Sequence, residues 1–365
     1  MFPDLRTRLG AVAVALLLAS AATPGQQQIP ALSPAGFFPP LEAYLESLRQ
    51  QAGIPGMSAA VVQNGEIVWE RGFGFQNVAS RVRATPDTPY LVGDLSETLA
   101  SVLLLQCVEE RRLDLDEPIR RYGVDSPDSG LTLRQILSHT SGEAGSEVFT
   151  YSVERFAQLT PVMESCVPQP YRKSVEHRLL KRLAMKDSVP GTDLQDPELV
   201  LPEGLFDPAD LDRYRRVLDR IAVPYKVDGH GRPERTELPL GPMTTSGGLV
   251  TTVRDLARFD AAVDSFLLLH DDTLALAWSP VTPRGGGPLL PTGLGWFVQT
   301  YRNERVVWHF GLVANAYSSL IVKLPARHFT FILLANSDGL STPFQLSSGD
   351  VTRSIFATLF LRLVA

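Results

Sequence analysis

Basic residues are too few to give this chain a positive charge. Its 34 lysines and arginines stand against 40 aspartates and glutamates, so the formal net charge is -6 at pH 7. A nucleic-acid partner normally requires a basic surface, and this composition argues against one. Long apolar runs are also scarce. The most apolar one, residues 9–19, is too short to span a bilayer comfortably, and no later stretch could span one.

Cysteine is equally rare, with Cys107 and Cys166 the only two in the sequence. Neither lies in a metal-ligand spacing. The two can pair only if their Cα atoms come within about 7 Å, which the sequence does not determine. Cys107 belongs to the apolar run 102–108, which favours a buried free thiol.

The N-terminal residues are typical of a secretory signal. Two arginines precede the apolar run, and small residues ending at Ala22 would allow cleavage. We therefore expect a signal peptide at 1–22, a Gln- and Pro-rich linker at 23–40 and a secreted or periplasmic protein. A retained N-terminal anchor is the alternative. Residues 41–365 are long enough for one large domain or two intertwined ones, with an ample core.

Strand-like sequence is concentrated at the two ends of this region. Asn64-Gly65 separates apolar runs at 57–63 and 66–71, which is typical of a hairpin with a type I′ turn. The glycine-rich segment 72–75 is expected to end the second strand. Further strands are expected at 295–300, 305–309, 316–324 and 328–335, and helices at 41–51, 96–112, 131–137, 156–185, 210–221, 256–266 and 351–363.

This order predicts an α+β fold. Strands from both chain ends should share one antiparallel sheet flanked by helices, and the helical middle should form an inserted lobe. The sheet lobe would comprise residues 41–92 and 290–365, and the helical lobe residues 93–289. A cleft between two lobes is a natural site for a small-molecule or cell-envelope ligand.

A series of short motifs in fixed order adds a resemblance. Each is weak alone, but their order and spacing from Leu41 to the C-terminus resemble the serine β-lactamase and penicillin-binding-protein superfamily, in its class C β-lactamase, D-alanyl carboxypeptidase and esterase branch. The resemblance implies a β-lactamase/transpeptidase-like fold. The motifs are Ile54-Pro55-Gly56-Met57, Asn64-Gly65, Phe73-Gly74, Thr88-Pro89-Tyr90-Leu91-Val92-Gly93, Leu113-Asp114-Leu115-Asp116-Glu117-Pro118, Ser138-His139-Thr140-Ser141-Gly142, Ser246-Gly247-Gly248-Leu249 and Trp308-His309-Phe310-Gly311.

The first catalytic motif that the resemblance implies is Ser-x-x-Lys at the start of a central helix. The serine attacks an acyl carbon, and the lysine one turn later assists proton transfer. Here the register places Asp94 at the serine position and Glu97 at the lysine position. Ser96 lies about 200° around the helix from position 94, so it does not simply substitute for the nucleophile.

The second implied motif, Tyr-x-Asn, is best matched by Tyr151-Ser152-Val153, in which valine replaces the asparagine. The third, His-x-Gly on a strand at the cleft, is matched by His309-Phe310-Gly311. The backbone N–H of Leu312 would then be the second donor of the oxyanion hole. Ordinary structural roles, a half-buried aromatic for Tyr151 and a hydrogen-bonded histidine for His309, are the alternatives.

Asp94 and Glu97 have two interpretations. Asp94 is a good N-cap, and Glu97 three residues later would complete a capping box at the positive end of the helix. The other interpretation is that Asp94, Glu97, Tyr151 and His309 line one cleft and hold a divalent cation or a cationic ligand. We take the capping interpretation, with no cofactor and no metal. His139 is interpreted as structural.

Acyl transfer needs a hydroxyl that can be deprotonated and a base that takes its proton, and a carboxylate is a poor nucleophile. The sequence therefore predicts a catalytically inactive homologue of serine hydrolases that retains the fold and cleft for binding a ligand or partner. The alternative is an active serine-type hydrolase, acting on β-lactams, D-Ala peptides or esters, that recruits Tyr151, Ser96 or Ser152. Fold alone does not decide between them.

Overall fold

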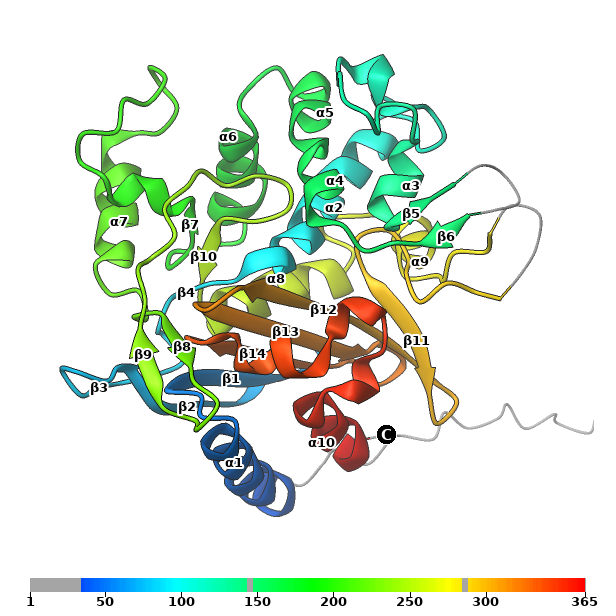
Figure 1. Cartoon of the computed structure of the whole chain (residues 1–365). Helices are drawn as coiled ribbons and strands as arrows, with labels where there is room; N and C mark the ends of the chain where they lie inside the picture. The colour runs from blue at the N-terminus through cyan, green and yellow to red at the C-terminus, as the bar shows by residue number, and fades with distance from the viewer. Residues whose placement is uncertain (1–33, 143–146, 284–287, 365) are drawn as a thin grey trace, which may run out of the picture. The chain divides into compact units, whose positions relative to one another are not determined.

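The computed structural model describes residues 34–142, 147–283 and 288–364 (Figure 1). The predicted signal peptide and most of the predicted linker lie outside these residues. Among the described residues, no helix has the length and apolar character needed to cross a membrane.

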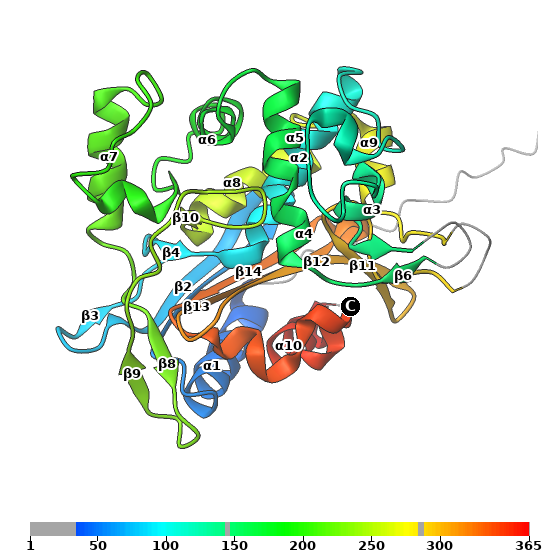
Figure 2. The same cartoon turned by 45° about the horizontal axis from the view of Figure 1, so that its top comes forward.

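One antiparallel sheet of seven strands combines strands from the N-terminal and C-terminal parts of the chain, which confirms the predicted α+β architecture (Figures 1 and 2). Its order is β11-β12-β13-β14-β1-β2-β3. Because β1 pairs with both β2 and β14, residues nearly 280 positions apart in sequence are hydrogen-bonded neighbours. The strands are β1 (Gly56–Gln63), β2 (Glu66–Asn77), β3 (Val82–Arg83), β11 (Phe297–Tyr301), β12 (Glu304–Val313), β13 (Tyr317–Leu324) and β14 (Phe329–Ala335).

The first hairpin forms as its sequence predicts. Asn64 and Gly65 both have positive φ, 52° and 79°, as a type I′ turn requires. The second strand is longer than predicted, because it continues past the glycines to Asn77. Gly72 allows this continuation. A Cβ at this position would lie 2.0 Å from the carbonyl oxygen of Ala84, so the segment at Ala84 can come this close only to a glycine.

Helices cover both faces of the sheet. Helix α8 (Val253–Asp264) contacts β1, β2 and β14, and its N-cap Thr252 accepts a hydrogen bond from the Asp255 N–H. Helices α1 (Pro34–Gln51) and α10 (Ile355–Val364) contact each other on the opposite side (Figure 2). Helix α1 begins at Pro34, inside the segment predicted as linker, because Phe37 and Leu41 are both buried and hold that first part in place.

The middle of the chain is mainly helical. Its central helix is α2 (Ser96–Glu109), in which every residue from Ser96 to Cys107 is buried. Around it are α3 (Leu133–Leu137), α4 (Val153–Ala157), α5 (Leu159–Cys166), α6 (Tyr171–Val175) with a π-helical turn at Glu176–Lys181, α7 (Pro208–Leu218) and α9 (Asp271–Ala277). Short strands join these helices: β4 (Tyr90–Leu91), β5 (Thr140–Ser141), β6 (Val148–Phe149), β7 (Val189–Pro190), β8 (Tyr225–Val227), β9 (Pro233–Arg235) and β10 (Leu249–Thr251).

The interpretation of Cys107 as a free thiol is wrong. Cys107, near the end of α2, forms a disulfide with Cys166, the last residue of α5, with the two Cα atoms 6.3 Å apart. The apolar surroundings that suggested a thiol bury the bond instead, because Cys107 is fully buried and Cys166 nearly so. The disulfide ties the central helix to its neighbour.

Candidate functional site

The start of α2 is packed directly against the end of β12. A 3₁₀ turn at Gly93–Leu95 leads into the helix, and Gly93 has a φ of 57°. A Cβ on Gly93 would lie 2.8 Å from the Leu312 nitrogen, and one on Gly311 would lie 1.8 Å from the Val92 oxygen. Only glycines permit this approach, so the two glycines bring Asp94 and Leu312 into one place.

Asp94 does not cap the helix. The residues at the two cap positions are Val92 for the 3₁₀ turn and Leu95 for α2, and neither helix start has a side-chain cap hydrogen bond. The Asp94 carboxylate instead accepts a hydrogen bond of 3.0 Å from the Tyr151 hydroxyl. The capping-box interpretation is therefore wrong, because a tertiary partner takes the carboxylate that the cap would have used.

Glu97 is turned toward two histidines. Its Oε2 lies 2.9 Å from His139 Nε2 and 3.4 Å from His309 Nε2. All three side chains are inside the protein, with exposed fractions of 0% for Glu97, 5% for His139 and 1% for His309. We refer to Glu97, His139 and His309 as the buried triad. Asp94 and Tyr151 lie beside it, since the tilted rings of Tyr151 and His139 have centroids 4.4 Å apart and Tyr151 donates to Asp94.

The hydrogen-bond partners fix which nitrogen of each neutral histidine carries a proton. His139 Nδ1 accepts the Ser152 N–H at 3.3 Å, so its Nε2 carries the proton and donates to Glu97. His309 Nδ1 lies 2.7 Å from the Phe310 carbonyl and donates to it, so its Nε2 offers a lone pair. That lone pair and Glu97 Oε1 have no hydrogen-bond partner within the described part of the chain.

Burial perturbs the acids and bases of this site. It raises the pKa of Glu97 to about 7. Burial and then the charge of Glu97 raise the pKa of Asp94 well above its usual 3.8. Burial, with a smaller contribution from the charge of Arg155, lowers the pKa of His139 to about 3. Burial also raises the pKa of Tyr151 well above 10, so Tyr151 remains a hydroxyl donor and does not become a base.

The two serines that the sequence offered as nucleophiles have structural roles. Ser96 is fully buried; its hydroxyl donates to the Gly93 carbonyl at 2.8 Å and accepts the Leu249 N–H at 3.4 Å. Ser152 is the N-cap of α4, where its hydroxyl accepts the Arg155 N–H at 3.2 Å. The Ser96 hydroxyl has no base as a partner, whereas the Ser152 hydroxyl also donates to Glu154 Oε2 at 3.1 Å.

The structure thus brings together the sequence candidates Asp94, Glu97, Tyr151 and His309, and it adds His139. The sequence interpretation of His139 as purely structural missed its contact with Glu97. His139 follows α3 with a positive φ of 48°, and this left-handed turn directs its ring toward α2. A histidine at the end of a helix carries no sequence signal for that direction, so only the packing of α3 on α2 reveals it.

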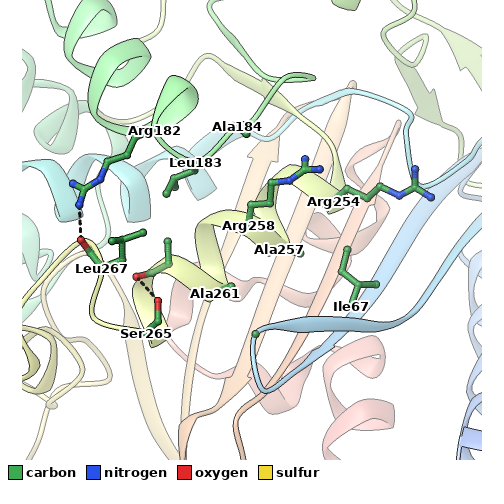
Figure 3. A pocket seen from close by; sticks show the side chains of 12 residues that line it. Ile67, Arg182, Leu183, Ala184, Arg254, Ala257, Arg258, Ala261, Ser265 and Leu267 are labelled. Carbon is green, nitrogen blue, oxygen red and sulfur yellow. Dashed lines mark hydrogen bonds between the residues drawn. The ribbon is translucent and has the colours of Figure 1, made fainter.

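A separate pocket of about 500 Å³ lies where α8 meets the first hairpin and the end of the π-helical turn (Figure 3). Its floor is mostly aliphatic, including Ile67, Leu183 and Ala261. Its arginines are already engaged: Arg182 donates to the Leu267 carbonyl, and the others pair with acidic side chains. The triad residues do not contribute to this pocket.

Comparison with known proteins decides the family. The model of the Beta-lactamase family matches residues 41–347, which includes every element of the site. The chain belongs to the β-lactamase family. Protein flp of Staphylococcus aureus (strain MW2) is 22% identical over 348 residues, which cover 83% of this chain and 64% of that protein. The chain therefore spans less than two thirds of the length of this curated relative.

Solved structures share the β-lactamase-family fold. The octameric penicillin-binding protein homologue from Pyrococcus abyssi superposes with a TM-score of 0.71 at 19% identity, over 89% of this chain and 77% of that one. A class C β-lactamase from Rhodobacter sphaeroides gives 0.65 at 15% identity, over 88% and 99%. At these identities the likeness concerns the fold alone, and it confirms the β-lactamase/transpeptidase-like fold expected from the sequence.

Proposed function

We propose that this β-lactamase-family protein does not perform serine-dependent acyl transfer and that it uses the fold and the site region to bind a ligand or partner. The observation that carries the proposal is the side chain at position 94 and its hydrogen bond. Its side chain is a carboxylate that accepts the Tyr151 hydroxyl, at the point where the resemblance implies a nucleophilic serine. A carboxylate is a poor acyl acceptor, and its acyl product would be a mixed anhydride.

The surroundings of Asp94 support the same conclusion. At the position of the expected lysine, Glu97 brings a second acid in place of a cation. Such a site lacks the positive charge that would attract the anionic carboxylate of a penicillin-like or peptide substrate. Tyr151 keeps its proton, and Ser96 is bonded to the backbone, so neither supplies the missing nucleophile.

Covalent trapping tests the proposal. The purified protein is incubated with a penicillin and, separately, with an acyl-fluorophosphonate probe, and the intact mass is measured. We expect no stoichiometric adduct. An adduct would refute the proposal and support the hydrolase alternative, with which the hydrolase-type structural neighbours are compatible. Mapping the adduct to Tyr151, Ser96 or Ser152, and its loss in the matching alanine or phenylalanine variant, would identify the nucleophile.

The double substitution Asp94→Ser with Glu97→Lys tests the assigned positions. It supplies a hydroxyl and an ammonium at the helix start, so we expect slow acylation without full turnover, because Val153 still stands where the family motif has asparagine. Glu97→Lys alone is the matched control and should show no adduct. A double variant as inert as the wild type would mean that the geometry of the site, and not only two side chains, differs from that of active enzymes.

We also propose that the protein is exported, on the basis of the sequence of residues 1–22. The Cys107–Cys166 disulfide supports this proposal, because such bonds persist mainly in oxidising compartments. Cell fractionation with N-terminal sequencing would check it. A mature protein that begins near Thr23 outside the cytoplasm is expected, and an uncleaved cytoplasmic chain would contradict it.

A further inference from the structure

We propose that the buried triad, Glu97, His139 and His309, is a binding site for a divalent transition-metal ion of the zinc type. This inference goes beyond the proposed function and does not depend on it. Its basis is the convergence of three potential ligand atoms, one from each side chain, that all lie within 4.8 Å of one another. They come from three segments: the first turn of α2, the residue after the end of α3, and β12.

The spacing of the ligand atoms fits a small cation. Zinc bonds of about 2.0–2.1 Å to nitrogen or oxygen place neighbouring tetrahedral ligands about 3.3–3.4 Å apart. The Oε2 of Glu97 and the Nε2 of His309 are 3.4 Å apart, and the Oε2 of Glu97 and the Nε2 of His139 are 2.9 Å apart. Of these two pairs only the second must open, by a few tenths of an ångström, for both of its ligand atoms to reach one ion, and all three ligand atoms lie within 4.8 Å of one another.

Two acceptor atoms of the buried triad lack a hydrogen-bond donor among the described residues. His309 Nε2 and Glu97 Oε1 lack hydrogen-bond partners among the described residues, although both side chains are at least 99% buried. Buried acceptors are normally satisfied, and two of them side by side are unfavourable without a positive group between them. The His309 tautomer is already that of a metal ligand, because its other nitrogen donates to a backbone carbonyl.

Charge favours the same occupant. A divalent cation bound to Glu97 would compensate the negative charge of that buried carboxylate. Two imidazoles and one carboxylate form a ligand set typical of zinc sites, whereas magnesium and calcium prefer oxygen ligands alone.

His139 makes the binding conditional. In the structure its Nε2 proton is donated to Glu97, so ligation through Nε2 requires that the proton move to Nδ1. Nδ1 would then lose the 3.3 Å hydrogen bond from the Ser152 N–H. The competing occupant is therefore a proton shared between Glu97 and His309, which would satisfy the same lone pair without disturbing His139.

Metal titration decides between the two occupants. The full-length protein is stripped with a chelator, dialysed and titrated with zinc chloride by calorimetry, with magnesium chloride as a comparison. Cobalt(II) is added to a separate sample of the stripped protein, its visible absorption is recorded, and zinc is then added. We expect one zinc per chain, no saturable heat with magnesium, and a cobalt spectrum of tetrahedral nitrogen and oxygen ligation that zinc abolishes.

Variants locate the site. His309→Gln and Glu97→Gln should each weaken zinc binding more than about 100-fold, beyond the 10- to 100-fold loss that follows removal of an outer-shell partner. His270→Gln is the matched control, because His270 is 76% exposed and its Nδ1 lies 3.6 Å from Glu109 on the surface. This control should leave zinc binding unchanged.

Several results would overturn the proposal. These are absence of stoichiometric zinc binding to the folded wild type, equal binding by all variants, and loss of binding in His270→Gln alone, which would assign the ion to the surface. Circular dichroism checks that each variant is folded. If both ligand variants unfold, the wild-type cobalt spectrum decides, because a surface ion with mainly water ligands gives only weak octahedral absorption.

Discussion

Replacing Glu97 by glutamine is expected to change the pH dependence of stability in the metal-free protein. Burial raises the pKa of Glu97 from 4.5 in its ordinary state to about 7. As the pH rises, the carboxyl group of Glu97 therefore loses its proton at a lower pH in the unfolded chain than in the folded protein. The contribution of Glu97 to stability is fully present below pH 4.5 and is lost as the pH rises through about 7. At about 1.4 kcal/mol per pKa unit, the loss amounts to about 3 kcal/mol.

The ionisation of His139 changes the stability with pH in the opposite direction. Burial lowers its pKa from 6.5 to about 3, so its contribution is present above pH 6.5 and is lost as the pH falls through about 3. Between pH 4.5 and 6.5 the two opposite slopes cancel in the wild type. The Glu97→Gln variant loses the pH dependence of stability that is due to Glu97, and its amide oxygen can still accept the hydrogen bond from His139. The variant should therefore lose about 1.4 kcal/mol of stability for each pH unit below 6.5.

Urea unfolding at a series of pH values, with a chelator present and tryptophan fluorescence as the signal, measures this effect. From pH 4.5 to pH 8, the free energy of unfolding of Glu97→Gln relative to the wild type should rise by about 3 kcal/mol. Glu203→Gln, at an exposed carboxyl, corrects for the general effect of removing one negative charge. Parallel curves for wild type and Glu97→Gln would refute the reasoning, because they would show that the fold does not perturb the ionisation of Glu97.

Two further substitutions test the packing around this site. Replacing both Cys107 and Cys166 by alanine should lower the free energy of unfolding by up to about 4 kcal/mol, because the bond joins residues 59 positions apart; an unchanged urea midpoint would contradict the disulfide. Tyr151→Phe removes the donor to the buried Asp94 carboxylate and should cost about 1–3 kcal/mol in the same assay. Tyr44→Phe, at a side chain that is 56% exposed, is its control and should have little effect.

The site residues occupy the positions of all three family motifs. Asp94 and Glu97 occupy the helix start that the family resemblance marks as catalytic, and Tyr151 and His309 occupy the other two motif positions. In the structure these side chains are buried together: the Tyr151 hydroxyl donates to Asp94, and Glu97 Oε1 and His309 Nε2 have no hydrogen-bond partner within the described residues. This arrangement explains how the helix start can be kept as architecture while its chemistry is altered.

Much of the fold follows from local sequence signals. The Asn64-Gly65 turn and the strands of the last third lie where their patterns predict them. These features depend on residues close together in sequence, namely turn residues with positive φ and alternating apolar residues. The extension of the second strand to Asn77 was not predicted. Its glycines suggested the end of a strand, but at Gly72 the missing side chain allows the segment at Ala84 to lie close to the strand.

The sequence by itself determined that this is an α+β protein of the β-lactamase type with two acids at the start of its central helix. The tertiary structure alone decided what those acids do. Their side chains could have bonded the helix's own N–H groups, as a capping box does. They bond Tyr151 and His139 instead, because β12 packs against the helix start and the segments after α3 and before α4 bring those partners within reach. The pairing of the two cysteines was decided in the same way, since helix packing sets the distance between them.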